Sequence, residues 1–480
     1  MHFFLNLMNS HLQPIPSRWF NGHVWRPIVT GVLAAQIIAM VLLWNSNQRV
    51  IEKAWLIEAS GYLSVPTFRV ASSLSQMGSI ACGGLFFSLT LGVLLSLLTV
   101  LWKSIWKGFP RFRIGILALG GGFWFACLWG INANGFSVLP AIFFAAVPLS
   151  ILILASFSPP KELNVSKTGF NLPFVAPLII LSGVLIFSYE HSVFVRFRDA
   201  VLLDSPLGEA INRFYYRYTL MAAEAIKPIH QKSVKTFRWN GEWPEEIKNE
   251  MKIILIKKDY LPVPDDPSPD IIVSVDPSGV TLKDYYGKSE TISHEEFKSA
   301  PSRYLDAFSI QSDQFTFFRR ALLISLLIGF PFLVYMLCYE CLFCLSQIFL
   351  DKNYAAVTAG ALCLAMGLGV FAAVNFHDTA PLKLDDLPAL SRSSEVPIRI
   401  KTAQALAHST SNEAGEVLRE MMMDSQVNVS CMAIWALGSR RDRAYIETLR
   451  DFLLNQADWY RQWYAYQALR KLGWRQQPSR

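Results

Sequence analysis

The sequence has little charge for its length and lacks the signatures of soluble enzymes. Asp, Glu, Lys and Arg make up 17% of its 480 residues, whereas about a quarter is usual in a soluble chain. Walker, dinucleotide-binding, zincin, nucleophile-elbow and haem-attachment motifs are all missing. These absences argue against an ordinary soluble-type enzyme, and the sequence predicts no cofactor and no catalytic or metal-binding residue.

Clustered positive charge is missing as well, although the formal net charge is +7. The Lys and Arg residues are dispersed, and several flank apolar runs, where such residues set topology and contact anionic headgroups. We therefore expect the lipid bilayer, and not nucleic acid, as a partner. A disulfide framework is not expected, since the cysteines number seven and four of them lie inside apolar runs: Cys82, Cys127, Cys338 and Cys363.

Apolar residues are in excess, at 52% of the chain, and they are gathered in blocks. A helix that rises about 1.5 Å per residue crosses about 30 Å of hydrocarbon with about 20 apolar residues. Seven segments come close to this length: Pro27–Trp44, Gly78–Trp102, Ile114–Ile131, Phe136–Phe157, Leu172–Tyr189, Ala321–Ser346 and Tyr354–Phe376. The first is followed by Asn-Ser-Asn rather than by a small-x-small cleavage site, so we interpret it as an uncleaved span.

The basic residues of the short loops predict the orientation of these spans. Four of them lie in the link between the second and third segments: Lys103, Lys107, Arg111 and Arg113. This link should be cytoplasmic. Seven crossings then place the N-terminus in the cytoplasm and both soluble parts outside it, as in a protein of the bacterial inner membrane. The loop 45–77 falls outside by the same count, despite Arg49, Lys53 and Arg69.

The soluble parts divide the chain into domains. We assign residues 1–190 and 320–376 to the membrane domain, 191–319 to an α+β domain, 377–394 to a linker and 395–480 to a repeat domain. Within the α+β domain, apolar residues recur at helical spacing over 197–227, which predicts an amphipathic helical pair. Short β-branched runs between turn residues predict strands at 252–257, 270–275 and 279–285.

The C-terminal part contains an internal repeat. The segment that begins at Ile398 aligns with the one at Val429, at an offset of 31, and with the one at Arg461, at a further 32. Each copy has an Ala-Leu step, preceded three residues earlier by a small residue: Thr402, Ala433 and Ala465. Small residues let helices approach closely, while Leu fills the core between them. With second helices expected at 414–423 and 444–454, the unit is a helix pair of about 31 residues.

This pattern resembles HEAT-like repeats of the short phycobilisome-lyase type, over residues 395–480 only. The resemblance implies a small α-solenoid that binds other proteins. No lyase activity is carried over, and Cys431 is interpreted as packed core. The candidates for the partner-binding region are Arg399, Trp435, Trp459, Tyr460 and Trp463. Because so few units rarely form a free-standing solenoid, we expect the array to lean on the membrane domain or on a partner.

Polar groups at the ends of spans are further candidate sites. Glu340 lies in the sixth segment, while Glu190-His191 and His377-Asp378 follow the fifth and the seventh. Ionisable groups in or near a span are costly and often functional. The two pairs share the outer edge by parity and could form a proton or metal site, although solvation of the helix ends explains them equally well.

Two features of the spans support alternatives. Cys338, Cys341 and Cys344 with Glu340 could hold a soft metal, but thiols three residues apart on a helix point in different directions, and packing between helices also explains them. Gly120-Gly-Gly and the proline pairs in the fourth and fifth segments break or kink helices, as transporters do to open a midplane site.

The sequence therefore predicts an α-helical membrane protein of about seven transmembrane helices, with a small α+β extramembrane domain and a C-terminal α-solenoid of HEAT-like helix pairs. Its expected role is that of a membrane-anchored scaffold or accessory subunit of a cell-envelope complex, which docks a partner protein through its repeats. A transporter or permease subunit is the alternative, and a membrane redox or metal enzyme comes third.

Overall fold

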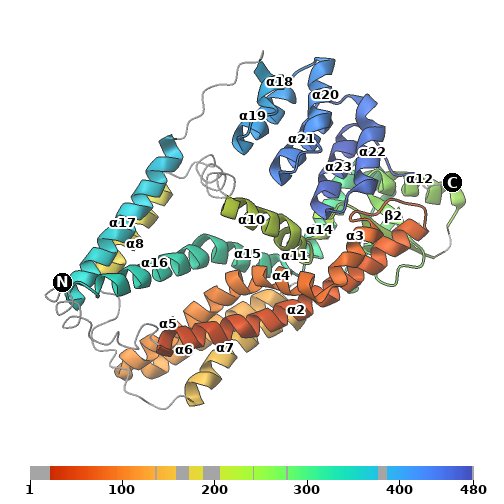
Figure 1. Cartoon of the computed structure of the whole chain (residues 1–480). Helices are drawn as coiled ribbons and strands as arrows, with labels where there is room; N and C mark the ends of the chain where they lie inside the picture. The colour runs from red at the N-terminus through yellow and green to blue at the C-terminus, as the bar shows by residue number, and fades with distance from the viewer. Residues whose placement is uncertain are drawn as a thin grey trace.

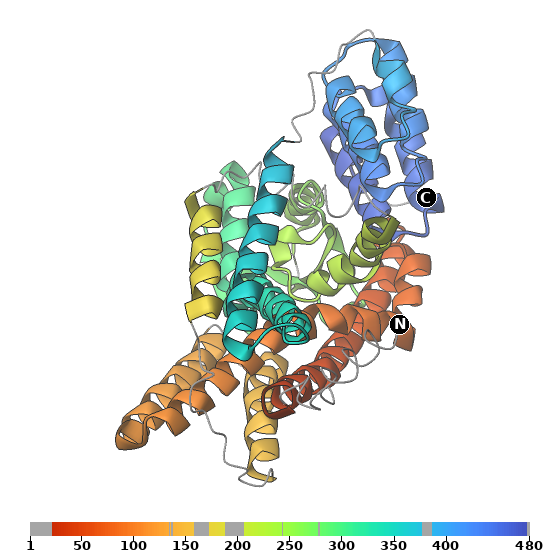
Figure 2. The same cartoon turned by 60° about the vertical axis from the view of Figure 1, so that its left-hand side comes forward.

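The structure is a computed structural model, mostly helical with one small sheet (Figure 1). It describes residues 22–133, 135, 138–157, 172–187, 206–241, 243–276, 279–376 and 386–477. Apolar helices occupy the bottom and the left of Figure 1, the repeat helices occupy the top, and the sheet lies behind them at the right. In Figure 2 the repeat helices stand above the rest of the chain.

Five helical segments are long and apolar enough to cross a membrane: Trp25–Ala59, Met77–Trp106, Pro110–Asn132, Thr316–Ser346 and Lys352–Ala372. They are built from α2 (Gly22–Ala59), α4 (Met77–Phe87) with η2 (Ser88–Gly92) and α5 (Val93–Gly108), η3 (Pro110–Phe112) with α6 (Arg113–Asn132), α15 (Thr316–Ile324) with η6 (Ser325–Gly329) and α16 (Phe330–Ser346), and α17 (Lys352–Phe376). The other two predicted spans coincide with α7 (Val138–Phe157) and α8 (Leu172–Phe187), which are apolar but shorter in their fully described parts.

These helices pack as two groups joined by the α15–η6–α16 segment. The first group is α2, α4, α5, α6 and α7, whose shared core includes Phe87, Phe143 and Phe318. The second is α8, α16 and α17, in which the Tyr335 hydroxyl donates to the carbonyl of Phe174 at 2.6 Å. Because Phe318 lies on α15 and Tyr335 on α16, one long segment contributes to both cores.

The α+β domain contains a five-stranded sheet in the order β2-β1-β3-β4-β5. Its strands are β1 (Lys235–Asn240), β2 (Tyr260–Pro262), β3 (Ile271–Asp276), β4 (Gly279–Lys283) and β5 (Ser289–Ile292). β1 is parallel to β2 and β3, whereas β3, β4 and β5 are antiparallel. The sheet buries its apolar side chains against α12 (Glu245–Ile256), α13 (His294–Ser299) and α14 (Pro301–Gln311).

Two predictions for this domain were wrong. The run 252–257 forms the end of helix α12 rather than a strand, because Met251 and Leu255, one turn apart, are both fully buried. The described part of 197–227 is one continuous helix, not a pair: α10 (Pro206–Phe214), η4 (Tyr215–Thr219) and α11 (Leu220–Glu224) follow one another without a break. The predicted strands at 270–275 and 279–285 are confirmed as β3 and β4, although β4 ends at Lys283.

The repeat domain has the predicted helix pairs. α19 (Val396–Leu406), α21 (Val427–Ser439) and α23 (Trp459–Lys471) form one layer, and α20 (Asn412–Met421) and α22 (Ile446–Asn455) pack behind it, with the short α18 (Leu387–Leu390) beside α19 (Figure 1). The three small residues that define the repeat are fully buried. A Cβ on Gly438 would lie 2.7 Å from Ala468 Cα, so α21 and α23 approach closely, as their sequences predict.

Candidate functional site

The repeat domain does not stand free but rests on a platform made by three segments distant in sequence. These are the connection 60–76 between α2 and α4, which contains α3 (Phe68–Ser72), the helix η4–α11, and the turn just before β2. At the centre of the contact, Val70 and Leu74 of the connection and Met221 of α11 pack against side chains of α21 and α23. The expectation that the array leans on the rest of the chain is therefore confirmed.

Gln462 is the polar centre of this contact. Its Oε1 accepts from the backbone N–H of Thr67 at 3.0 Å, and its Nε2 lies 2.9 Å from Thr67 Oγ1. The same amide donates to the carbonyls of Leu453 and Gln456, which precede α23. Gln462 is fully buried, so all these bonds lie away from water. One side chain thus ties the third repeat to the connection 60–76.

A second amide repeats this arrangement at the end of the described chain. Gln476 accepts from the N–H of Leu63 at 3.1 Å and donates to its carbonyl at 2.8 Å. The side-chain amide of Gln476 thus bonds both backbone groups of Leu63, as the backbone of a neighbouring strand would. The connection 60–76 is therefore held at two points by the repeat domain.

The repeat domain also contacts the α+β domain through Asp259. This residue has a φ of 65° at the turn before β2, and its Oδ1 accepts from the Tyr466 hydroxyl at 2.6 Å and lies 3.0 Å from Arg470 Nε. Burial raises the pKa of Asp259 although Arg470 opposes the shift, and burial keeps the pKa of Tyr466 well above its ordinary value. The tyrosine therefore stays protonated and available as a donor.

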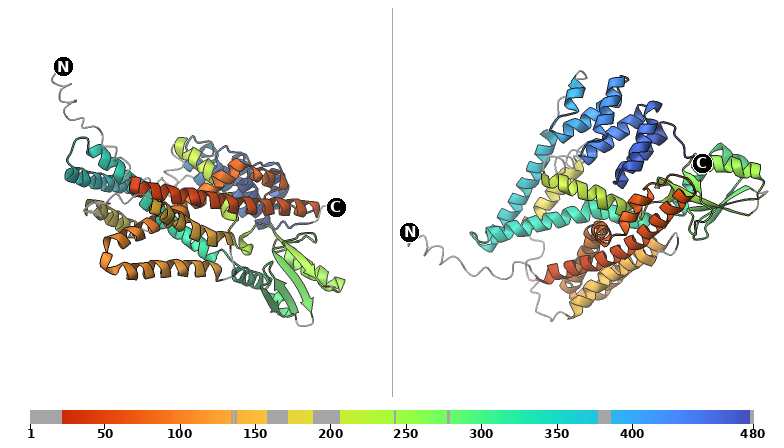
Figure 3. Two further views of the ribbon diagram at one scale, coloured as in Figure 1. Left: turned by 90° about the horizontal axis from the view of Figure 1, so that it is seen from below. Right: turned by 45° about the vertical axis from the view of Figure 1, so that its right-hand side comes forward.

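A buried charge cluster joins the far end of α2 to the same domain. Asp270, just before β3, lies 3.0 Å from Lys53 Nζ and 2.7 Å from Lys232 Nζ, and it accepts the N–H of Thr236 at 3.0 Å. Burial by itself would raise the pKa of Asp270, but the two ammonium groups and the Thr236 amide together hold it far below its ordinary range. Figure 3 shows the long α2 running from the apolar helices to the sheet.

The predicted partner-binding residues divide into two sets. Trp459 and Tyr460 are buried, with 5% and 6% exposure, in the contact with the platform, and Trp463 packs beside them. The Tyr460 ring lies 5.3 Å from that of Tyr216 in η4. Trp435, by contrast, is 37% exposed on α21. The aromatic end of the third repeat thus faces the chain's own platform, and the middle repeat presents its tryptophan outward.

Arg399 belongs to neither set, because its charge is already used within the first repeat. Its Nε lies 2.8 Å from Asp424 Oδ2, and its Nη1 donates to the carbonyl of Ser393 at 2.7 Å. Ser430 and Gln462 occupy the equivalent positions of the next repeats, and each also bonds a carbonyl near the end of the helix before it. Sequence reasoning missed Gln462. The polar residue that recurs at this position of each repeat is the signal that could have identified it.

The remaining predicted site residues are not brought together among the described residues. Glu340 is exposed on α16, while Glu190, His191, His377 and Asp378 lie outside the described residues. Across the part of the chain that the structure describes, no three His, Cys, Asp or Glu side chains gather as metal ligands. Cys431 is buried between α21 and the platform, and burial raises its pKa, in keeping with the packing role predicted for it.

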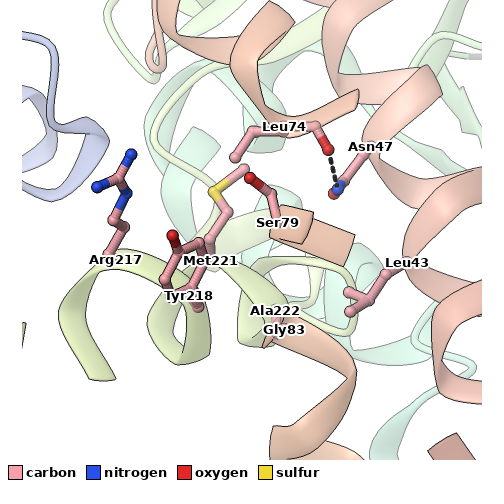
Figure 4. Close-up of a pocket in the computed structure, with 9 residues that line it drawn as sticks. All are labelled: Leu43, Asn47, Leu74, Ser79, Gly83, Arg217, Tyr218, Met221 and Ala222. Atoms are coloured by element: carbon pink, nitrogen blue, oxygen red, sulfur yellow. Dashed lines mark hydrogen bonds between the residues drawn. The ribbon is translucent and has the colours of Figure 1, made fainter. Parts of the chain in front are cut away.

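A small pocket lies where the platform meets the apolar helices (Figure 4). Its wall is mostly apolar, with Leu43, Leu74 and Met221 among the lining residues. Asn47 takes part in the wall but is engaged, since its Nδ2 donates to the carbonyl of Leu74 at 3.0 Å. Arg217 and Tyr218, which are neighbours in η4, are the titratable side chains among its lining residues.

One surface of the repeat layer remains open. It lies on the C-terminal halves of α19, α21 and α23, beyond the part that the platform covers, and we name it the Trp435 face. Its members are exposed or half-exposed: Lys401, Gln404, His408, Trp435, Ser439 and Lys471. Lys471 Nζ lies 4.7 Å from the centre of the Trp435 ring and 3.3 Å from Ser439 Oγ, so the lysine covers one side of the indole.

Comparison with known proteins identifies the repeat domain only. The family model for HEAT repeats matches residues 387–470. No curated protein and no solved structure matches the chain. The C-terminal domain therefore consists of HEAT repeats, as the sequence predicted, and no family is assigned to the rest of the chain.

Proposed function

We propose that the protein is a membrane-anchored scaffold or accessory subunit of a cell-envelope complex and that its HEAT repeats dock a partner protein. The observation that carries this proposal is the way the array is mounted. HEAT repeats generally mediate protein–protein interaction. Here Gln462, Gln476 and Tyr466 fix the array to the rest of the chain while the Trp435 face stays open. A fixed array with an open face suits a docking role.

The proposal includes seven spans, with α7 and α8 as the fourth and fifth. These two helices are consecutive, so counting both or neither leaves the sides of all later segments unchanged. The contacts support the resulting sidedness, because the connection 60–76, the α+β domain and the repeat domain touch one another and must share a side. We place this shared side outside the cytoplasm, opposite the basic link that contains Arg111 and Arg113.

The charge cluster at Asp270 accounts for the apparent exception to this orientation. The predicted loop 45–77 carries Arg49, Lys53 and Arg69, the first two within the end of α2, although basic loops favour the cytoplasm. Lys53 is paired with Asp270, so its charge is neutralised within the folded chain. The loop is therefore less basic than its sequence suggests, which favours the extracytoplasmic assignment.

Co-purification from mild detergent tests the docking role. We expect the full chain to retain partner proteins that a variant lacking residues 393–480 loses. Because that deletion uncovers Val70, Leu74 and Met221, the membrane insertion of the truncated variant must be checked by its resistance to carbonate extraction. If an inserted truncated variant keeps every partner of the full chain, the repeats are not the docking site.

A transporter or permease subunit is the second candidate, and one feature of the helix bundle favours it. The π-helical segments η2 and η6 belong to different spans and pack against each other, and such segments are frequent at functional sites. Ser88 of η2 donates to Gln36 Oε1 at 2.8 Å, whereas the buried Ser325 hydroxyl of η6 has no hydrogen-bond partner among the described residues. This role requires that the full chain, reconstituted alone in liposomes, moves a solute.

A further inference from the structure

The two layers of the repeat domain differ sharply in charge. The helices α19, α21 and α23 contain no Asp or Glu at all. The helices α20 and α22 carry five acidic residues: Glu413, Glu416, Glu420, Glu447 and Asp451. Within the repeat helices, acidic side chains are therefore confined to α20 and α22, while others such as Asp424 and Asp458 lie in the connections. The helices that bear the Trp435 face carry only basic charges.

The basic side chains of this layer fall into those that are paired with a carboxylate and those that are not. Arg399 is paired with Asp424, Arg461 lies 3.5 Å from Asp458, and Arg470 is paired with Asp259. Lys401 and Lys471, which belong to the first and third repeats, are exposed, and no carboxylate is paired with either among the described residues. The uncompensated charges thus lie on both sides of Trp435, since adjacent repeats stack side by side.

Trp435 provides an anchor between the two charges. Tryptophan is among the residues that contribute most to binding energy at protein interfaces. Its ring is held by Lys471 on one side and is 37% exposed. An apolar side chain of a ligand can cover the remaining ring surface without displacing the lysine.

We propose that the Trp435 face binds an acidic segment of a partner protein, with carboxylates at Lys401 and Lys471 and an apolar side chain on Trp435. This inference rests on the proposed docking function and names the chemistry of its partner. An acidic protein segment fits better than the bilayer, because the platform contacts the N-terminal halves of α21 and α23, at Val427 and Trp459, whereas the Trp435 face lies on their C-terminal halves. Paired charges of this kind give specificity and fast association more than affinity.

The test measures fluorescence anisotropy of a labelled peptide of Asp, Glu and Leu, titrated with the full-length protein in detergent. The reference peptide replaces Asp and Glu by Asn and Gln. We expect the acidic peptide to bind at low salt and to weaken as salt rises. We expect Trp435→Ala, and the double change Lys401→Glu with Lys471→Glu, each to reduce its affinity about tenfold or more.

The matched control is the double change Arg419→Glu with Arg450→Glu. It alters the charge equally but on α20 and α22, where both arginines are exposed, so it should leave the affinity within about twofold. Equal binding of the two peptides, or an equal loss in the control, would overturn the inference. The inference would also be overturned if phosphatidylglycerol vesicles bound the protein through Lys401 and Lys471 while neither peptide bound.

Co-purification with the same variants separates this inference from the docking function. If partners are lost on removal of 393–480 but retained in the Lys401→Glu, Lys471→Glu variant, the repeats still dock a partner and the acidic-segment inference is wrong. If the truncated chain itself retains every partner, the docking function fails. The expected result is loss in both.

Discussion

Replacing Gln462 by alanine should release the connection 60–76 from the repeat domain. The change removes four hydrogen bonds, each worth about 1 kcal/mol net, and it leaves the buried Thr67 N–H without an acceptor, at a cost of about 1–3 kcal/mol. Because two of the four bonds join residues within the repeat domain, we assign about 3 kcal/mol to the contact itself. This loss is enough to open the contact locally without unfolding the helices.

Hydrogen exchange of the Thr67 amide measures this opening directly. Every 1.4 kcal/mol is a factor of ten, so about 3 kcal/mol predicts exchange about a hundredfold faster in the peptide that covers 60–76. The matched control is Gln467→Ala on the same helix, at a half-exposed position, which should leave this exchange unchanged. Equal exchange rates in the wild type and the Gln462→Ala variant would refute the assignment of Gln462 as the fastening point.

Three further predictions follow from other contacts. Asp270→Asn should destabilise the protein by about 1–3 kcal/mol, because the half-exposed Lys53 and Lys232 lose the buried carboxylate that they share; a lower thermal midpoint in detergent would show this. Since the pKa of Asp270 is lowered on folding, its contribution is present above about pH 4 and is lost as the pH falls further, so the variant should lose less stability in acid than the wild type. Gly438→Val should destabilise the repeat domain by about 2–3 kcal/mol, because its Cβ would meet the backbone of α23, as urea unfolding followed by circular dichroism can measure. Cysteines placed at the exposed positions Tyr285 and Gln477, in a chain without native thiols, should react with a membrane-impermeant reagent in spheroplasts, whereas one at Phe109 should react only after lysis; the reverse pattern would invert the proposed orientation.

The sequence predicted best what depends on local periodicity. The repeat helices begin and end within a few residues of their predicted bounds, because the spacing of Ala433 and its equivalents determines both the helix face and the packing distance. The prediction of a strand at 252–257 was wrong because it also depended on a local pattern alone. Its β-branched residues are typical of a strand, but the buried pair Met251 and Leu255 continues a helical pattern that begins outside the run.

The mounting of the repeat domain could not be predicted in detail. Gln462 and Thr67 are 395 residues apart, and neither has an unusual neighbourhood in the sequence. Trp459 and Tyr460 resembled ligand-binding aromatics, yet their burial depends on a surface formed by α11 and the connection 60–76. Such contacts arise from the shapes of two folded parts, and a periodic pattern within either part carries no information about them.

The length of α2 has a consequence for the geometry of any partner. In the proposed orientation Trp44 marks the headgroup level, and the helix continues without a break for fifteen residues, to Ala59. At about 1.5 Å per residue this rigid extension is about 22 Å long, and Lys53 braces it against the sheet. The main contact of the repeats lies beside Val50, six residues past Trp44, so in this orientation the repeats begin about 9 Å above the headgroup level. A partner anchored in the same membrane could therefore meet the repeats close to the lipid surface, whereas the sheet braced by Lys53 would lie farther out along α2.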